Sequence, residues 1–302
     1  MSKFTIMVDT GCDMPQEYLD KHSIKVVPIM FNLDGVEHEN GRWQEITAEG
    51  FYEALANGAV AKTTLINQGV FEDVFTDYAK RGEELLLITL SSGLSGTYEN
   101  AVNALKEIKE TYPNCKIFVV DSLNACGGIG MVLIQAVKKR AGGASLEETG
   151  KWLEERRHRC LSLFTVNDLM YLHRGGRLSK VQAIAGSIIG IKPLLNVHPD
   201  GTLKLKDKAR GRKASLERMA GQMKRSLNPD TKVDDVVIIH ADCRDDAMIL
   251  LDFIKDQIEV DEAYVEVMGP VIGTHVGPGC IALFYVADMD RPEYEEKFYG
   301  GK

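Results

Sequence analysis

A short loop rich in serine and glycine carries the clearest chemical pattern in this sequence. Residues 85–90 form an apolar run typical of a buried strand, residues 91–97 (Ser-Ser-Gly-Leu-Ser-Gly-Thr) follow, and apolar residues recur at helical spacing from 98 to 108. Ser95 is therefore expected beside a helix start, where unpaired backbone N–H groups favour a phosphate or carboxylate. The pattern predicts an anion site at the C-terminal end of a strand, as in open α/β sheets. The simpler alternative is a turn in which Ser95 only caps the helix.

Two further segments carry hydrogen-bonding or charged groups suited to an anion. Lys62-Thr63-Thr64 lies in an expected loop at 61–67 ahead of a helix, so the hydroxyl of Thr63 is predicted to converge with Ser95 unless it is solvated or caps the helix. Arg174 and Arg177 flank a glycine pair that permits tight backbone geometry beside fixed positive charge. A helix that ends at Gly175 explains the same arginines equally well.

Two more features lie in the second half of the chain. The glycine-rich stretch 273–279 is expected to be a loop that exposes His275, an imidazole able to act as acid, base or hydrogen-bond donor. Basic residues alternate at Lys204, Lys206, Lys208, Arg210 and Arg212, and on an extended strand all five would project from one face. We call this set the basic ribbon. It is expected to be either a solvated outer face or a docking surface for an acidic or phosphorylated partner.

Standard catalytic and cofactor motifs are largely absent from the sequence. Residues 93–97 approach the G-x-S-x-G nucleophile elbow but place their second glycine one residue early. No P-loop occurs, and the dinucleotide fingerprint is incomplete at 128–130. Six scattered cysteines show no C-x-x-C pair, and Asp9 and Asp13 are interpreted as turn residues. Free thiols, no metal and no cofactor are therefore expected.

Composition indicates a folded, two-domain cytoplasmic protein. The chain has 302 residues, 44% of them hydrophobic, with a net charge of −8, which argues against a general nucleic-acid binder. We expect no signal peptide and no membrane-spanning segment.

Apolar runs alternate with helical patterns in the first half, which predicts a parallel-sheet α/β domain over residues 1–150. After the glycines at 142–143, Ser145 and Glu148 form a capping box that opens a charged helix. The second half, 151–302, contains strands joined by a turn at 198–201 together with long helices, which indicates an antiparallel sheet in an α+β domain. A cleft is expected between the two domains.

An ordered set of motifs, spread over nearly the whole chain, closely resembles the DegV family of bacterial fatty-acid-binding proteins. The segments that carry the resemblance are Val8-Asp9-Thr10-Gly11-Cys12-Asp13-Met14-Pro15, Phe51-Tyr52, Lys62-Thr63-Thr64, Ser91-Ser92-Gly93-Leu94-Ser95-Gly96-Thr97-Tyr98, Val120-Asp121-Ser122, Leu172-His173-Arg174-Gly175-Gly176-Arg177-Leu178-Ser179, Gly190-Ile191-Lys192-Pro193 and His275-Val276-Gly277-Pro278-Gly279.

The resemblance implies one long-chain fatty acid in the cleft, with its carboxylate held by Thr63 and Ser95. It also implies a carrier role: a separate fatty acid kinase subunit phosphorylates the bound carboxyl group, and the acyl phosphate enters phospholipid synthesis. Arg210 and His275 would then lie on the kinase-facing side. The sequence departs from the family pattern at Leu65-Ile66-Asn67 and at His173. Residues 161–164 and 184–191 are candidates for lining the acyl tail or for an ordinary core role.

Two other functions remain open from the sequence. A serine hydrolase or acyltransferase would use Ser95 with His275 or His240, and needs a base within hydrogen-bond reach of Ser95. A regulatory protein would bind nucleic acid through the basic ribbon with steep salt dependence, which the net charge of −8 disfavours.

Overall fold

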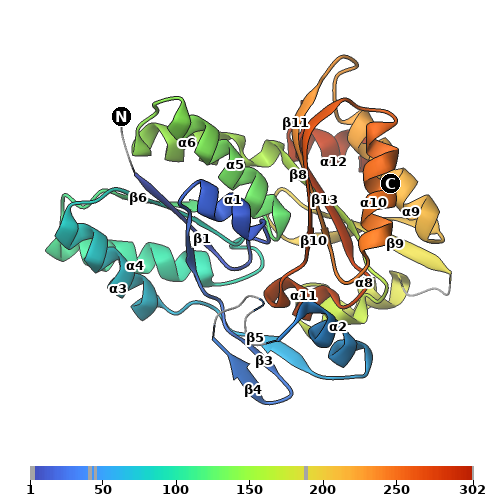
Figure 1. Ribbon diagram of the computed structural model, residues 1–302, viewed down its shortest axis with the longest axis horizontal. Coiled ribbons are helices and arrows are strands. Elements are labelled where there is room, and N and C mark those ends of the chain that lie inside the picture. Colours follow the sequence, from blue (N-terminus) through green and yellow to red (C-terminus); the bar gives the residue numbers. More distant parts are fainter. Residues whose placement is uncertain (1–3, 40–42, 44–45, 187–189, 301–302) are drawn as a thin grey trace.

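The first sheet of the computed structural model, which describes residues 4–39, 43, 46–186 and 190–300, is fully parallel. Its order is β2 (Lys25–Val27), β1 (Thr5–Asp9), β6 (Leu85–Thr89), β7 (Ile117–Asp121). Helices α3 (Gln68–Arg81) and α4 (Thr97–Thr111) lie on one side of it, and α5 (Gly127–Ala141) and α6 (Leu146–Arg156) on the other, with the short α1 (Gln16–Lys21) after β1 (Figure 1). This arrangement confirms the predicted parallel α/β domain.

The second sheet has six strands in the order β10 (Leu203–Arg210), β9 (Ile191–Val197), β8 (Cys160–Thr165), β13 (Ile281–Val286), β11 (Val233–His240), β12 (Val260–Val267). Its pairs are antiparallel except β11 with β12, so the expected antiparallel sheet is in fact mixed. Three helices, α9 (Arg212–Arg225), α10 (Arg244–Lys255) and α12 (Arg291–Tyr299), cover one face. The predicted α+β class of the second domain is confirmed. The domain boundary at residue 150 stays a prediction, and helix α6 runs across that position.

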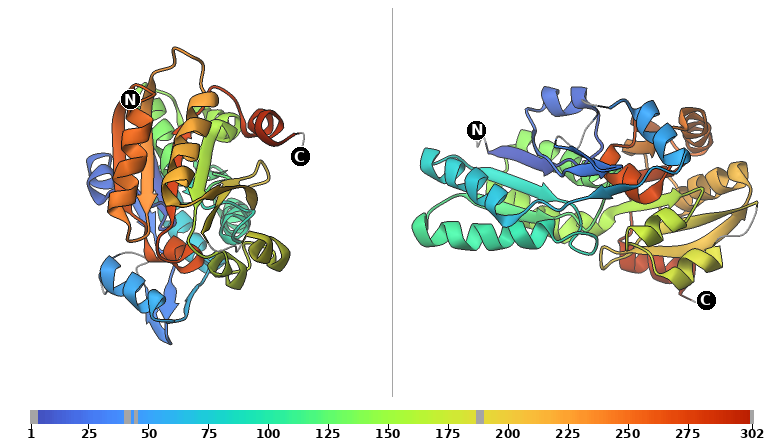
Figure 2. Two further views of the ribbon diagram at one scale, coloured as in Figure 1. Left: turned by 90° about the vertical axis from the view of Figure 1, so that its right-hand side faces the viewer. Right: turned by 90° about the horizontal axis from the view of Figure 1, so that it is seen from below.

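A small antiparallel sheet joins the two halves. It contains β4 (Val36–His38), β3 (Phe31–Leu33) and β5 (Ala61–Thr63). In the chain, α2 (Ala48–Ala56) lies between β4 and β5. Although α2 is early in the chain, it lies among C-terminal elements, beside α11 (Pro270–Val276) (Figures 1 and 2). Short helices α7 (Met170–Arg174) and α8 (Lys180–Gly186) complete this region, with a single 3₁₀ turn, η1 (Arg157–Arg159), before β8.

Local sequence rules fix several helix starts. Thr47 caps α2 by accepting a hydrogen bond from the Gly50 N–H at 3.1 Å. Ser145 and Glu148 form the predicted capping box of α6. At α4 the N-cap is Gly96, so Ser95 lies one residue before the cap rather than on it.

Two expected loops are ordered elements instead. The expected loop at 61–67 begins as strand β5, because residues 61–63 pair with β3 and place Thr63 opposite Phe31. The expected loop at 273–279 is helical up to Val276, because Pro270 begins α11 and presets the backbone angle of its first turn.

The basic ribbon does not form. A β-bulge between Leu205 and Asp207 changes the alternation, so that Lys204 pairs with Asn196 whereas Lys208 pairs with Pro193, three residues away. Lys204 and Lys208 therefore point to opposite faces of the sheet. Lys206 forms an ion pair with Glu295, and Arg212 lies in α9 beside Asp246 at 2.8 Å.

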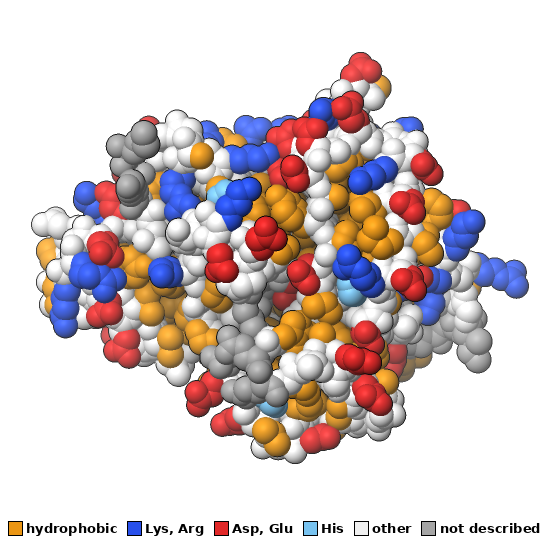
Figure 3. All heavy atoms as spheres, viewed as in Figure 1, with side chains coloured by type: hydrophobic (Ala, Val, Ile, Leu, Met, Phe, Trp, Pro, Cys, Tyr) orange, Lys and Arg blue, Asp and Glu red, His pale blue; other side chains and the backbone are white. Residues whose placement is uncertain are grey.

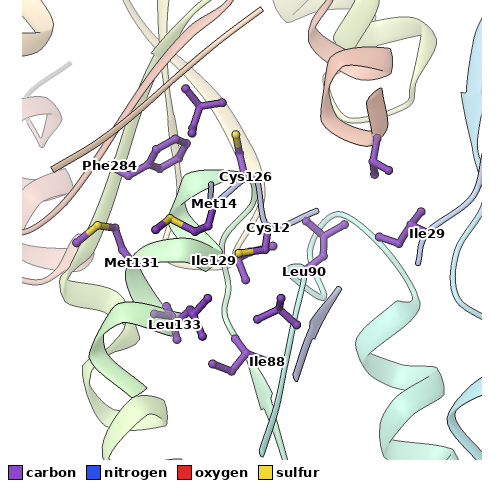
Figure 4. Packing of buried hydrophobic residues seen from close by; sticks show 14 of the residues in the cluster. Cys12, Met14, Ile29, Ile88, Leu90, Cys126, Ile129, Met131, Leu133 and Phe284 are labelled. Atoms are coloured by element: carbon purple, nitrogen blue, oxygen red, sulfur yellow. The ribbon is translucent and has the colours of Figure 1, made fainter. Parts of the chain in front are cut away.

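The junction of the two domains is a continuous apolar core. Figure 4 shows Cys12, Met14, Cys126 and Ile129 from the N-terminal half beside Phe284 of β13. Close approach depends on a glycine: a Cβ on Gly127 would lie 2.6 Å from side-chain carbons of Phe284 and Val237. The glycine at the start of α5 thus lets this helix pack directly on the second sheet.

We expect Gly127→Ala to destabilise the protein by about 1–3 kcal/mol through overpacking. The matched control is Gly221→Ala, within α9, where a Cβ would meet nothing within 4 Å. That substitution is expected to stabilise by about 0.5–1 kcal/mol, because alanine loses less backbone entropy in a helix. Urea unfolding of both variants tests the pair, and an unchanged midpoint for Gly127→Ala would contradict the tight junction.

Candidate functional site

A cavity of about 420 Å³ lies where the two main sheets and the small sheet meet. Its volume falls within the roughly 300–1,000 Å³ of small-molecule sites. Most of its wall is apolar, and its polar groups come from four segments remote in sequence. The lining residues are Ile29, Thr63, Thr64, Leu65, Leu90, Ser92, Leu94, Ser95, Gly96, Ala125, Leu172, Arg177, Leu203, Val271, Ile272, His275 and Val276.

Thr63 and His275 form a direct hydrogen bond in this cavity. The Thr63 Oγ1 lies 2.8 Å from His275 Nε2, which joins the end of β5 to the last turn of α11. Burial, together with the positive charge of Arg177, lowers the pKa of His275 to about 4. The imidazole is therefore neutral at pH 7, and its Nδ1 packs against Gly175, where a Cβ would lie 2.3 Å away.

Ser95 enters the same cavity from the β6–α4 loop. Its backbone N–H donates to Ser91 O at 3.1 Å, and its Oγ accepts from the Thr97 N–H at 3.3 Å and lies 3.0 Å from Thr97 Oγ1. Thr97 Oγ1 in turn accepts from the Ile66 N–H at 3.4 Å, which ties this loop to the segment that carries Thr63. The predicted convergence of Thr63 and Ser95 on one cavity is thus seen in the structure.

The four other predicted site residues divide into two groups. Arg177 lines the cavity, where its Nε donates to Leu94 O at 3.1 Å and burial lowers its pKa. His275 lies beside Thr63 in a helix, not exposed in a loop as expected, because α11 turns its imidazole inward. Arg174 is exposed, 4.4 Å above the Tyr171 ring, and Arg210 is exposed at the end of β10.

The segments suggested for an acyl tail do not supply the described walls. Leu161 and Leu163 face the second apolar core under α9 and α10, on the other side of the sheet. Ile184 is 60% exposed, and 187–189 lie outside the described residues. The apolar walls come instead from residues such as Leu90, Leu94 and Val271, which sequence patterns mark as core but cannot assign to a cavity.

Metal and disulfide chemistry have no support in the described part of the chain. No group of three or more histidine, cysteine or acidic residues there could hold a metal ion. None of the six cysteines, all of which are among the described residues, forms a disulfide. No helix within the described ranges is both long and apolar enough to cross a membrane. On the face in Figure 3, basic and acidic side chains are interspersed rather than gathered into one basic field.

A family model described as "Uncharacterised protein, DegV family" matches residues 3–288. The chain belongs to the DegV family. A DegV domain-containing protein of Clostridium perfringens is 35% identical over 293 residues, covering 97% of this chain and 100% of the relative.

Solved structures of the DegV family share the whole fold. A Thermotoga maritima protein described as revealing a fatty acid binding function matches with a TM-score of 0.82 and 29% identity, covering 95% of this chain and 100% of its own. A DegV family protein from Thermus thermophilus, described as binding fatty acid, matches with a TM-score of 0.83 and 27% identity, covering 94% of this chain and 99% of its own.

The depressed pKa of His275 predicts a specific acid sensitivity. Between its ordinary pKa of 6.5 and about 4, the unfolded chain binds a proton that the folded chain does not, so stability falls as the pH drops through this window and is unaffected above it. Relative to His275→Gln, the wild type should lose about 2–3 kcal/mol of unfolding free energy between pH 7.5 and 4.5.

Chemical denaturation of both proteins at each pH measures this difference. The buried Asp9, whose pKa burial raises to about 6, shifts stability in the opposite direction, but it is present in both proteins and cancels. A difference that does not change with pH would contradict the burial of a neutral His275.

Proposed function

We propose that this protein binds one long-chain fatty acid in the cavity, with the carboxylate at Thr63 and Ser95 and the acyl chain along the apolar walls. One observation carries the proposal: a cavity of about 420 Å³ with mostly apolar walls gathers the hydroxyls of Thr63 and Ser95 and the cation of Arg177. A carboxylate with a hydrocarbon tail has the matching distribution of polar and apolar surface.

Energetics favour this division of the cavity. Burial of a carboxylate costs several kcal/mol unless hydrogen bonds replace its hydration, and hydroxyl donors provide such bonds. The acyl chain contributes about 0.8 kcal/mol for each CH₂ group that leaves water. The head-group donors thus fix the orientation, while the tail supplies most of the affinity.

His275 has a defined part in this arrangement. When its neutral ring donates from Nε2 to Thr63 Oγ1, the hydroxyl proton of Thr63 is left free to donate to the ligand carboxylate. The low pKa keeps the ring from carrying a second proton at pH 7. We therefore assign His275 to the head group rather than to the partner-facing side.

The described properties of two relatives support this proposal. Both the Thermotoga and the Thermus proteins are described as binding fatty acids, and each shares the fold over nearly its whole length at 27–29% identity.

We further propose that the protein is a carrier without its own catalysis, which presents the carboxyl group to a separate fatty acid kinase for acyl-phosphate formation in phospholipid synthesis. Arg210 and Arg174 are exposed cations in the C-terminal domain and suit contact with an acidic partner surface.

The geometry favours this carrier over the hydrolase. A serine hydrolase requires a base on the nucleophile, but Ser95 Oγ contacts Thr97 and His275 Nε2 contacts Thr63. His240 is buried outside the cavity lining, where its Nδ1 accepts from the Cys243 N–H at 3.3 Å.

Removal of the hydroxyls should weaken binding of fatty acid without unfolding the protein. Thr63→Val and Ser95→Ala are each expected to lower oleate affinity about 10- to 100-fold, because each removes a hydrogen bond to a charged group. Together they should abolish lipid retention during purification. Native mass spectrometry gives the occupancy and a fluorescent fatty acid titration gives the affinity.

Thr63→Ser is the matched control, since it keeps the hydroxyl, and it should retain most of the affinity. Unchanged occupancy in the double variant would place the carboxylate elsewhere in the protein.

Substitutions of Arg210 and His275 should distinguish fatty acid binding from presentation of the fatty acid to the kinase. Arg210→Ala should retain bound fatty acid but lose most kinase-dependent acyl-phosphate formation, with a defect that depends on salt because exposed charges are screened. His275→Ala should lose fatty acid affinity itself. Lipid occupancy measured beside ATP consumption, with a fatty acid kinase and ATP added, distinguishes the two. Loss of lipid in Arg210→Ala would overturn this assignment.

A further inference from the structure

A buried arginine far from the cavity in sequence has an unusual set of partners. Arg291, the first residue of α12, is 1% exposed, and its hydrogen bonds to the described residues all go to backbone carbonyls. Nη1 donates to Leu123 O at 2.6 Å and to His198 O at 3.4 Å, while Nε and Nη2 donate to Cys160 O at 3.3 and 3.1 Å. The ion pairs of the described residues do not include it. Burial lowers its pKa to about 10, so it remains charged at pH 7.

An apolar side chain of similar size would fill this space without the cost of desolvating a cation. The guanidinium therefore does something that packing does not: it joins three separate chain segments through their carbonyls. Two of these segments are the supports of the loop that carries Ser95.

The first support is the segment after β7. Asn124 O accepts from the Ser91 N–H at 2.9 Å, and Asp121 Oδ1 accepts from the N–H groups of Ser92 at 3.2 Å and Leu123 at 2.9 Å. Leu123 has a φ of +47°, a left-handed conformation that costs a side-chain-bearing residue free energy. The bond from Arg291 holds the carbonyl of this strained residue in place.

The second support is the turn between β9 and β10. Within it the Gly201 N–H donates to His198 O at 2.9 Å, and Gly201 O accepts from Ser91 Oγ at 2.8 Å. The turn fits closely against the loop, since a Cβ on Gly93 would lie 2.7 Å from the carbonyl carbon of Gly201. Ser91 O then accepts from the Ser95 N–H at 3.1 Å, which completes the path to the cavity.

We infer that Arg291 is a positioning residue for the head-group site: its guanidinium holds both supports of the 91–95 loop and thereby fixes the place of Ser95 in the cavity. This inference rests on the proposed function. It makes α12, at the C-terminal end of the fold, part of the machinery that binds the carboxylate, although none of its residues lines the cavity.

A double-mutant cycle with Ser95 tests this inference. Arg291→Met keeps the length and removes the donors, and it should lower oleate affinity about tenfold or more, because misplacement of a donor by about 1 Å weakens its bond. In a Ser95→Ala background the same substitution should change affinity less than about twofold, since the group that Arg291 positions is already gone. Arg291→Lys, which keeps the charge and one donor group, should fall between Arg291→Met and wild type.

Arg140→Met is the matched control. Arg140 also donates from its guanidinium to two backbone carbonyls, Phe4 O at 3.2 Å and His22 O at 2.8 Å, but away from the cavity lining. The Arg140→Met variant should keep oleate affinity within about twofold of wild type, even if its thermal midpoint falls as far as that of Arg291→Met.

Several results would overturn the inference. Equal fold-losses of affinity for Arg291→Met with and without Ser95, or wild-type affinity in a folded Arg291→Met protein, would reduce Arg291 to a structural role. If Arg291→Met does not fold, Arg291→Lys carries the same comparison with the same outcomes. A wild-type protein that binds no oleate would contradict the proposed function, whereas a loss confined to Ser95→Ala would contradict only the role of Arg291.

Discussion

The hydrogen bond between Thr63 and His275 requires two chain segments, 212 residues apart, to meet inside the protein. A partly buried polar contact of this kind is most stable when both sides are held rigidly, because a lost partner leaves a polar group unsatisfied. Much of the structure holds α11 in place for it. Gly269 N–H donates to Asp13 Oδ1 at 3.0 Å, and Tyr52 OH donates to Met268 O at 2.7 Å. Each bond runs from the N-terminal half to the segment just before α11.

The need to hold distant segments in place also accounts for the buried aspartates at the junction of the two domains. Asp9 is fully buried and its carboxylate accepts from the N–H groups of Leu90 and Gly11, so the end of β1 holds the start of the loop after β6. Asp13 accepts from the Cys126 thiol at 3.0 Å as well as from Gly269. Asp9 accepts from Gly11 within its own turn, as predicted for a turn residue, whereas Asp13 instead connects segments, with partners 113 and 256 residues away.

Local patterns predicted the parts of this molecule that local physics controls. The capping box at Ser145 and the parallel strands of the first half follow from short-range signals. The convergence of Thr63 with Ser95 also follows, since both segments lie ahead of helices in the first half. The prediction of a basic ribbon was wrong because one bulged residue in β10 reverses which face the following side chains point to. Five alternating basic residues carry no sequence signal of such a bulge. Arg291 had no signal at all: a single arginine before a proline looks like a surface helix start, and only the long-range fold buries it.

The location of α11 and α12 near the end of the chain has a consequence for biosynthesis. Strand β5 with Thr63 and the loop with Ser95 leave the ribosome well before residues 270–276 and 291–299, which complete and brace their cavity. Until then the apolar walls of the cavity face water, and contacts between such distant segments form slowly because their loop-closure entropy must be overcome first. The cavity of a nascent chain therefore cannot close until α11 has left the ribosome.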